Sequence, residues 1–91
     1  MREQVELATF RQEIDAIDAA LVPLIEARLA LSARIGRYKK AQGLPIHQAD
    51  REREVLVKRA ALLKDTRWEK YLRPILQNMM DVGKAVQQDE A

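Results

Sequence analysis

Two cations interrupt an apolar stripe between residues 10 and 39, and their positions predict a site for a small anion. Arg28 and Lys39 lie on or beside this stripe, where a leucine would be the less costly residue. Eleven residues make about three helical turns, so both side chains project from nearly the same side of a helix, ~16 Å apart along its axis. Two long cationic side chains at that spacing can lean toward each other and bracket a small dianion.

A third cation, Arg11, does not fit the same arrangement within one chain. On a continuous helix it lies ~26 Å from Arg28 along the axis and points roughly 100° away. Arg11 can therefore join that ligand only if it comes from another copy of the chain.

Two further pairs of polar or small residues are candidates for the same site. Arg51 and Glu52 open the second predicted helix, although an Arg-Glu pair in a charged first turn is usually solvated surface. Gly83 and Gln87 are four residues apart on the third predicted helix. A glycine inside a helix costs about 1 kcal/mol relative to alanine, which indicates close packing or room for a ligand. The alternative for Gln87 is a polar residue at a helix end.

The residue types argue against nucleophilic and metal-dependent chemistry. His47 is the only histidine and has no second ligand at metal-binding spacing, so we expect an exposed loop residue. Ser32 has no nearby general base, and the chain contains no cysteine. The phosphate-binding and dinucleotide-binding glycine motifs are absent from the sequence, so we expect no cofactor and no metal.

The apolar spacing of three and four residues predicts one long helix from near Gln4 to about Ala41. Gly43 and Pro45 follow it as a stop signal. Pro23 removes one backbone hydrogen bond inside this segment, so we expect a kink there, the alternative being two helices. The stripe continues in phase across Pro23, which favours one helix. Its members are Phe10, Ile14, Ile17, Leu21, Leu24, Leu29, Leu31, Ile35 and Tyr38.

Two shorter helices are predicted in the rest of the chain. The second starts around Ala49 or Asp50 and is broken by residues 64–67; its inward residues are Val55, Leu56, Ala60 and Leu63. Thr66 and Glu69 have the spacing of a capping box, which places the start of the third helix at Thr66. This helix should end near Gln88, with a kink at Pro74 and a frayed tail from Asp89.

The helix lengths predict a dimer. A helix of about 38 residues is ~57 Å long, whereas helices of ~24 and ~33 Å cannot cover its stripe end to end. A compact domain of this size has a radius of gyration of only ~12 Å. We therefore expect an all-α fold, in which residues 1–91 form a single domain with one long and two shorter helices in an intertwined homodimer.

Composition narrows the class of protein. Sixteen basic and 14 acidic residues give a net charge of +2, which is too balanced for a dedicated nucleic-acid binder. The longest apolar run, residues 19–25, is too short to span a membrane. The first residues include acids and lack an apolar segment, so we expect no secretory signal and a cytoplasmic location.

Several segments together resemble the all-α class of chorismate mutases, over residues 7 to 88. They are Phe-Arg-Gln-Glu-Ile-Asp-Ala-Ile-Asp at 10–18, Leu-Ile-Glu-Ala-Arg at 24–28, Ile-Gly-Arg-Tyr-Lys-Lys at 35–40, Gly-Leu-Pro-Ile at 43–46, Asp-Arg-Glu at 50–52, and then Gly83 and Gln87. Each segment alone is weak evidence for this family, but the order and spacing of the segments together are specific to it. The resemblance implies an intertwined dimer that rearranges chorismate to prephenate without metal or cofactor, at the branch toward phenylalanine and tyrosine.

The resemblance also implies roles for single residues. Arg28 and the Arg11 of the other protomer would hold the two substrate carboxylates, with Arg51 in support. Lys39 and Gln87 would donate to the ether oxygen that gains charge as its C–O bond breaks, and Glu52 would accept from the ring hydroxyl. Such a rearrangement needs a dianion held in a reactive conformation beside a cation, which suits arginine and lysine side chains.

Two positions depart from the family pattern. Gln48 replaces a usual Asp, and Gly83 replaces a common Ser, so both bear on substrate affinity.

Two other functions stay open. Isochorismate-pyruvate lyases share the fold and a similar set of cations, although the loop at 43–46 and the pair Arg51-Glu52 favour the mutases. The remaining alternative is a non-catalytic helical dimerisation module.

Overall fold

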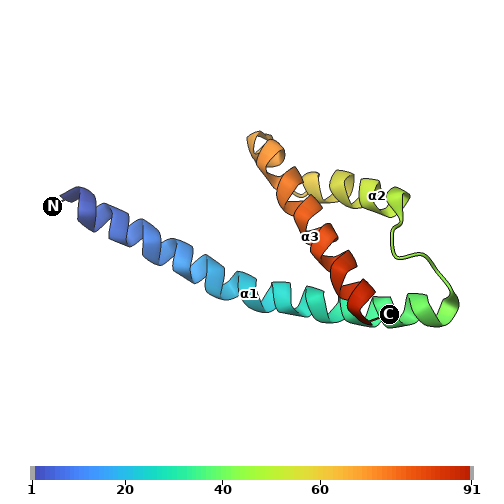
Figure 1. The fold of residues 1–91 in the computed structure, drawn as a ribbon. Coiled ribbons are helices and arrows are strands. Elements are labelled where there is room, and N and C mark those ends of the chain that lie inside the picture. Colours follow the sequence, from blue (N-terminus) through green and yellow to red (C-terminus); the bar gives the residue numbers. More distant parts are fainter. Residues whose placement is uncertain (1, 91) are drawn as a thin grey trace. The chain divides into compact units, whose positions relative to one another are not determined.

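The computed structural model describes residues 2–90, with side chains described from Gln4 onward. Its elements are α1 (Arg2–Gln42), α2 (Ala49–Ala60), the short 3₁₀ helix η1 (Thr66–Trp68) and α3 (Glu69–Glu90) (Figure 1). These elements confirm the prediction of an all-α chain with one long and two shorter helices. Over the described range, no helix is long and apolar enough to cross a membrane.

The long helix runs without interruption through Pro23, so the prediction of one helix rather than two is confirmed. It ends at Gln42, and the next residue, Gly43, has a φ of 67° in the left-handed region that glycine adopts without strain. Leu44 N–H then donates to Lys39 O at 2.8 Å and Gly43 N–H donates to Lys40 O at 3.3 Å. These bonds satisfy carbonyls in the last turn and stop the helix where the sequence predicted.

The start of the third helical segment differs from the prediction. The capping box between Thr66 and Glu69 is wrong, because Asp65 is the N-cap and its side chain accepts from Arg67 N–H at 3.0 Å. A short carboxylate one residue earlier satisfies a free N–H of the first turn, so the chain enters η1 before α3 begins at Glu69.

The end of α3 also differs from the prediction, because the helix continues to Glu90. Glu90 Oε2 lies 2.9 Å from Arg37 Nη1 on α1, an ion pair between exposed side chains. The expected frayed tail is therefore wrong for Asp89 and Glu90, and Ala91 lies outside the described residues.

The chain divides into two compact units, one up to Ala30 and one from Leu31 onward, so the boundary falls within α1. In the second unit α2 contacts α3. Among the residues whose side chains are described, the buried apolar ones all belong to these two helices and are Val55, Ala60, Leu76 and Met80. Leu56 is half-buried, as is Leu63, which follows the end of α2 instead of extending it.

The first unit consists of the N-terminal part of α1 alone. A single helix has no second element of its own against which to bury its apolar stripe. Leu29 is half-buried, and the other nine large apolar side chains described in this unit are 38–67% exposed: Val5, Leu7, Phe10, Ile14, Ile17, Leu21, Val22, Leu24 and Ile25.

Candidate active site

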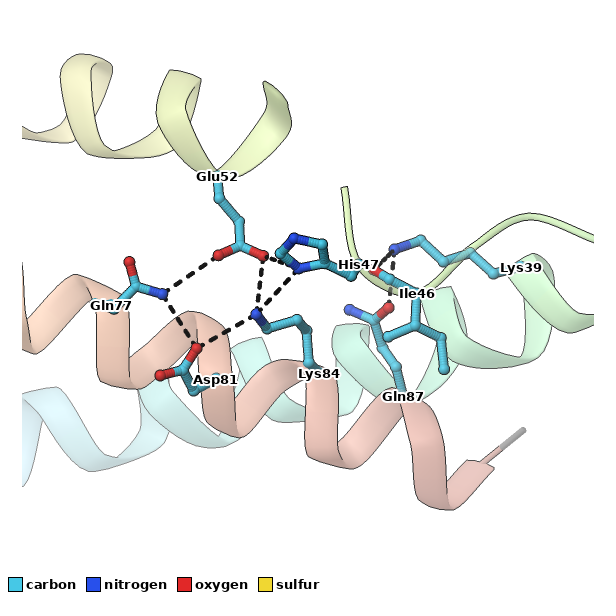
Figure 2. A network of polar contacts seen from close by, with 8 residues as sticks. All are labelled: Lys39, Ile46, His47, Glu52, Gln77, Asp81, Lys84 and Gln87. Carbon is cyan, nitrogen blue, oxygen red and sulfur yellow. Dashed lines mark hydrogen bonds and ion pairs between the residues drawn. The ribbon is translucent and has the colours of Figure 1, made fainter. Parts of the chain in front are cut away.

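Lys39 and Gln87, which are 48 residues apart in sequence, meet in the second unit. Lys39 Nζ donates to Gln87 Oε1 at 2.9 Å and to the backbone oxygen of Ile46 at 2.9 Å (Figure 2). Both side chains are half-buried. α1 supplies the lysine near its C-terminal end, α3 supplies the glutamine one turn before its end, and the 43–48 connection supplies the carbonyl.

This contact determines how the glutamine amide is oriented. An ammonium group has three donors and no acceptor, so Gln87 must turn its oxygen toward Lys39. The amide NH₂ of Gln87 is then directed away from the lysine, as Figure 2 shows. Lys39 uses two donors on Gln87 and Ile46 and retains a third. The pair therefore leaves one ammonium N–H and the amide NH₂ as donors for a ligand.

Gly36 allows α1 and α3 to come close enough for this pair to form. A Cβ added at Gly36 would lie 2.7 Å from both Cα and O of Gln87, closer than any real side chain tolerates. Gly36 is buried, and so is Ser32 one turn earlier on the same face of α1. Gly36 therefore leaves space for the backbone of α3 at the position where Gln87 reaches Lys39.

A second polar cluster surrounds Glu52 in the first turn of α2 (Figure 2). Its Oε2 lies 2.9 Å from Lys84 Nζ and 3.0 Å from His47 Nδ1, and its Oε1 accepts from Gln77 Nε2 at 3.3 Å. Gln77 also donates to Asp81 Oδ1 at 3.1 Å, and this oxygen lies 3.4 Å from Lys84 Nζ. Glu52 is thus not the solvated surface residue that its charged helix turn suggested: its side chain is 17% exposed.

The electrostatics of the two clusters are coupled through Glu52. The contact with the Lys84 ammonium, supported by Gln77 and His47, holds the pKa of Glu52 below its ordinary value although burial acts in the opposite direction. Burial lowers the pKa of the Lys39 ammonium, and the negative charge of Glu52 opposes that shift. Glu52 is therefore an anion at neutral pH and helps to keep Lys39 protonated.

Gln48 and Arg51 lie at the start of α2, beside a shallow hollow rather than at the Lys39–Gln87 pair. Gln48 occupies the N-cap position with extended backbone and makes no side-chain capping bond. Arg51 Nη1 lies 3.1 Å from Glu54 Oε1, and its side chain is 54% exposed. The hollow is lined by Pro45, His47, Gln48, Ala49, Asp50, Arg51 and Glu54.

The remaining sequence candidates fall into two groups. Gly83 is buried on α3 together with Leu76 and Met80, which agrees with the close packing that a glycine inside this helix indicated. Arg11 and Arg28 belong to the first unit, where Arg11 is exposed and Arg28 is half-buried. Within its own unit, each cation lies on a helix whose apolar stripe is uncovered.

Sequence reasoning missed Gly36, Lys84 and Gln77. The small residues Ser32 and Gly36, four apart on an otherwise bulky helix, were a signal for close helix approach. Lys84 and Gln77 gave no local signal, because a polar residue on an amphipathic helix resembles any solvated one.

His47 is exposed as predicted, at 64% of its side chain, but it lies against Glu52. Over residues 2–90 no group of three or more potential ligands could hold a metal ion.

Comparison with known proteins identifies a related family. The family model described as Chorismate mutase type II matches residues 10–88, which include every candidate residue discussed above. No solved structure matches the chain at a significant level.

Three curated relatives are each 43% identical to part of the chain. The bifunctional chorismate mutase/prephenate dehydratase of Aquifex aeolicus aligns over 60 residues, 66% of this chain and 17% of that protein. The T-protein of Enterobacter agglomerans aligns over 54 residues, 59% of this chain and 14% of that protein. The 4-amino-4-deoxychorismate mutase of Streptomyces venezuelae aligns over 51 residues, 56% of this chain and 50% of that protein. The chain thus spans half or less of each relative.

Proposed function

The chain belongs to the chorismate mutase type II family, and we propose that it rearranges chorismate to prephenate, in aromatic amino acid biosynthesis. In this pericyclic step an ether C–O bond breaks as a new C–C bond forms within the same molecule. No proton, electron or nucleophile is exchanged with the protein. The residues at the site suit such a reaction, because they are cations and amides rather than a nucleophile with its base.

Lys39 and Gln87 stabilise the ether oxygen as negative charge develops on it. The third N–H of the ammonium and the outward NH₂ of the amide are directed by the 2.9 Å bond between the two side chains. Because the donors are already oriented, little reorganisation is needed in the transition state. The half-buried position of both side chains strengthens this interaction relative to water.

The arginines bind the two carboxylates of the substrate. Arg28 and the Arg11 of the other protomer hold one carboxylate each, Arg51 supports them, and Glu52 accepts from the ring hydroxyl. Gln48 and Gly83 line the substrate in the places where the family usually has Asp and Ser. Arginine suits carboxylates because its planar group donates two parallel hydrogen bonds.

An intertwined homodimer brings these groups together. The first unit carries nine large apolar side chains that are at least 38% exposed, and the same helix carries Arg11 and Arg28. Fully burying one such side chain stabilises a fold by about 1.5–3 kcal/mol. α1 has 41 residues, whereas α2 and α3 have 12 and 22, so a second protomer is needed to cover the full stripe. The same packing brings Arg11 into the neighbouring site.

The single observation that carries this proposal is the Lys39–Gln87 contact. The test is to incubate the purified chain with chorismate and follow its loss and the appearance of prephenate. We expect turnover in the unmodified chain and a loss of at least ~10²-fold in Lys39→Ala. Lys58→Ala is the matched control, since Lys58 is an exposed lysine paired with Glu54 at 2.8 Å.

Other outcomes of this assay separate the alternatives. Release of pyruvate from isochorismate without prephenate from chorismate would indicate the lyase. A folded dimer with no turnover of either compound would indicate a non-catalytic dimerisation module. In both cases the proposed mutase activity would be wrong.

A further inference from the structure

Glu52 is the one proposed substrate-binding acid, and its surroundings carry positive charge. Lys84 Nζ and His47 Nδ1 lie 2.9 and 3.0 Å from its Oε2. Lys84 Nζ and His47 Nδ1 are themselves 3.4 Å apart. Gln77 and Asp81 complete the contacts from α3, and Lys39 on α1 interacts electrostatically with Glu52.

The pairing changes what Glu52 can offer a ligand. Its Oε2 is buried against Lys84 and His47, whereas its Oε1 accepts from Gln77 Nε2 at 3.3 Å. A carboxylate oxygen accepts more than one hydrogen bond, so Oε1 keeps capacity for a second donor, which a neutral ligand hydroxyl can supply. Its negative charge, in contrast, is paired with the Lys84 ammonium, which lies closer to Glu52 at 2.9 Å than to Asp81 at 3.4 Å. A ligand ammonium at the same place would be repelled by the Lys84 cation. Glu52 would attract it less than an unpaired carboxylate would, because Glu52 is already paired.

Two substrate chemistries differ at this group. Chorismate carries a hydroxyl on the ring carbon at position 4, and the name of the Streptomyces venezuelae relative describes a compound with an amino group there instead. An aliphatic amine is largely protonated at neutral pH, as the reference pKa of lysine shows. The choice between the two compounds is thus a choice between a neutral donor and a cation next to Glu52.

We propose that Lys84 is a specificity-determining residue: by pairing with Glu52 it makes the site select a 4-hydroxyl substrate over a 4-ammonium one. The inference rests on the proposed function, because it takes Glu52 as the group that faces the ring substituent. Specificity of this kind comes from a repulsive element against the wrong ligand as well as from attraction to the right one. Lys84 supplies the repulsion, and Glu52 supplies the acceptor.

The test compares kcat/KM for chorismate and for 4-amino-4-deoxychorismate in the unmodified chain and in three variants. Lys84→Met removes the cation and keeps the aliphatic length. Lys84→Arg retains the cation, and Lys58→Met removes a lysine paired with another glutamate at 2.8 Å. We expect Lys84→Met to shift the ratio toward the amino substrate by roughly tenfold or more, because one uncompensated charge is exposed to the ligand. Lys84→Arg and Lys58→Met should preserve the ratio.

A purely structural role for Lys84 would change both substrates alike and leave the ratio unchanged, which would overturn the inference. If Lys84→Met does not fold, as judged by its helical circular dichroism, Lys84→Gln replaces it; this variant can still donate to Glu52 but has no charge, and the same shift is expected. An unmodified chain that turns over chorismate while the ratio stays constant refutes only the role of Lys84. A folded chain inactive on both compounds refutes the proposed function and the inference with it.

Discussion

The two units of the chain differ in what they can do alone. The second unit buries apolar side chains between α2 and α3 and assembles two polar clusters, around Lys39 and around Glu52. The first unit is one helix on which nine large apolar side chains are exposed, yet it carries Arg11 and Arg28. The part proposed to stabilise developing charge is therefore formed within one unit, whereas the part proposed to bind carboxylates depends on another surface. The predictions below test this division.

The largest effect is expected from Lys39→Ala. Removing one oriented donor from such a site typically costs about 3–4 kcal/mol of barrier, or ~10²–10³-fold in kcat. The helical circular dichroism and the melting transition should change little, because Lys39 is only half-buried and is not one of the buried apolar residues of α2 and α3. Steady-state kinetics with chorismate measure the effect. Turnover within threefold of the unmodified chain would remove Lys39 from the mechanism.

Mixing two inactive variants tests whether the first unit works across protomers. Arg11→Ala and Arg28→Ala should each lose ~10²-fold in turnover, because each removes a carboxylate ligand. After unfolding and refolding together in equal amounts, half of the dimers are mixed, and each mixed dimer has one intact site. About a quarter of the unmodified turnover should return, as expected if sites are shared across a symmetric dimer.

The matched control for that experiment is the double variant Arg11→Ala/Arg28→Ala, mixed in the same way with Arg28→Ala. No site in this mixture contains both arginines, so activity should stay at the level of the single variants. If the first mixture also fails to recover, Arg11 is not contributed by a neighbouring chain.

A charge on the apolar stripe should separate the protomers. Ile17 is 64% exposed in the single chain, and Ile17→Asp would place an unpaired carboxylate inside the proposed interface. Burying such a group costs several kcal/mol, so we expect a Kd for the dimer at least ~10²-fold higher. Sedimentation equilibrium measures the dissociation.

Ala19→Asp is the control on the same helix, because its side chain points roughly 200° away from that of Ile17. It introduces the same charge in the same helical segment and should leave the dimer intact. Equal dissociation of both variants, or a chain that is monomeric without substitution, would contradict the assigned interface.

Gly36→Ala tests the close approach of α1 and α3. The added Cβ would meet Gln87 Cα and O at 2.7 Å, so α3 must move. Such overpacking usually costs about 1–3 kcal/mol of folding free energy. Because the displaced residue is Gln87, we also expect kcat to fall more than KM rises. Lys40→Ala, an exposed position on α1, is the control in chemical denaturation and kinetics.

The pH dependence of turnover should show the state of Lys39. Burial lowers the pKa of this ammonium, so its deprotonation begins below the ordinary lysine range. As pH rises through the lowered pKa, the amine loses the charge that stabilises the ether oxygen, and kcat should fall about tenfold per pH unit above it. Lys39→Gln should remove this basic limb. A limb that persists in Lys39→Gln belongs to another group.

The lowered pKa of Lys39 also changes how the free energy of unfolding depends on pH. A lysine whose pKa is lower in the folded state opposes folding while it is protonated, and this cost disappears as pH rises above the unfolded value. Glu52 behaves in the opposite sense, because its lowered pKa stabilises the fold above the unfolded value and that contribution is lost as pH falls through the folded one. Acid unfolding should therefore shift to higher pH in Lys84→Met.

The sequence by itself determined the helices and the residue types of the site. The apolar spacing of three and four residues and the glycine at position 43 were sufficient to predict α1 and its end. Both signals are local, because one reflects the helical period and the other reflects the backbone conformation of a single residue. The resemblance to a family placed Lys39, Gln87 and the arginines in one reaction. The cap at Asp65 was missed because two neighbouring residues offer competing acceptors for the same first turn.

The tertiary structure decided which side chains meet. Lys39 and Gln87 are brought together because α3 crosses α1 at Gly36, a contact between residues far apart in the chain. Lys84 pairs with Glu52 only because α2 and α3 pack against each other. The spacing of residues along α3 does not distinguish Lys84 from a solvated lysine. Long-range pairing depends on packing of whole elements, so a pattern read along one helix cannot specify it.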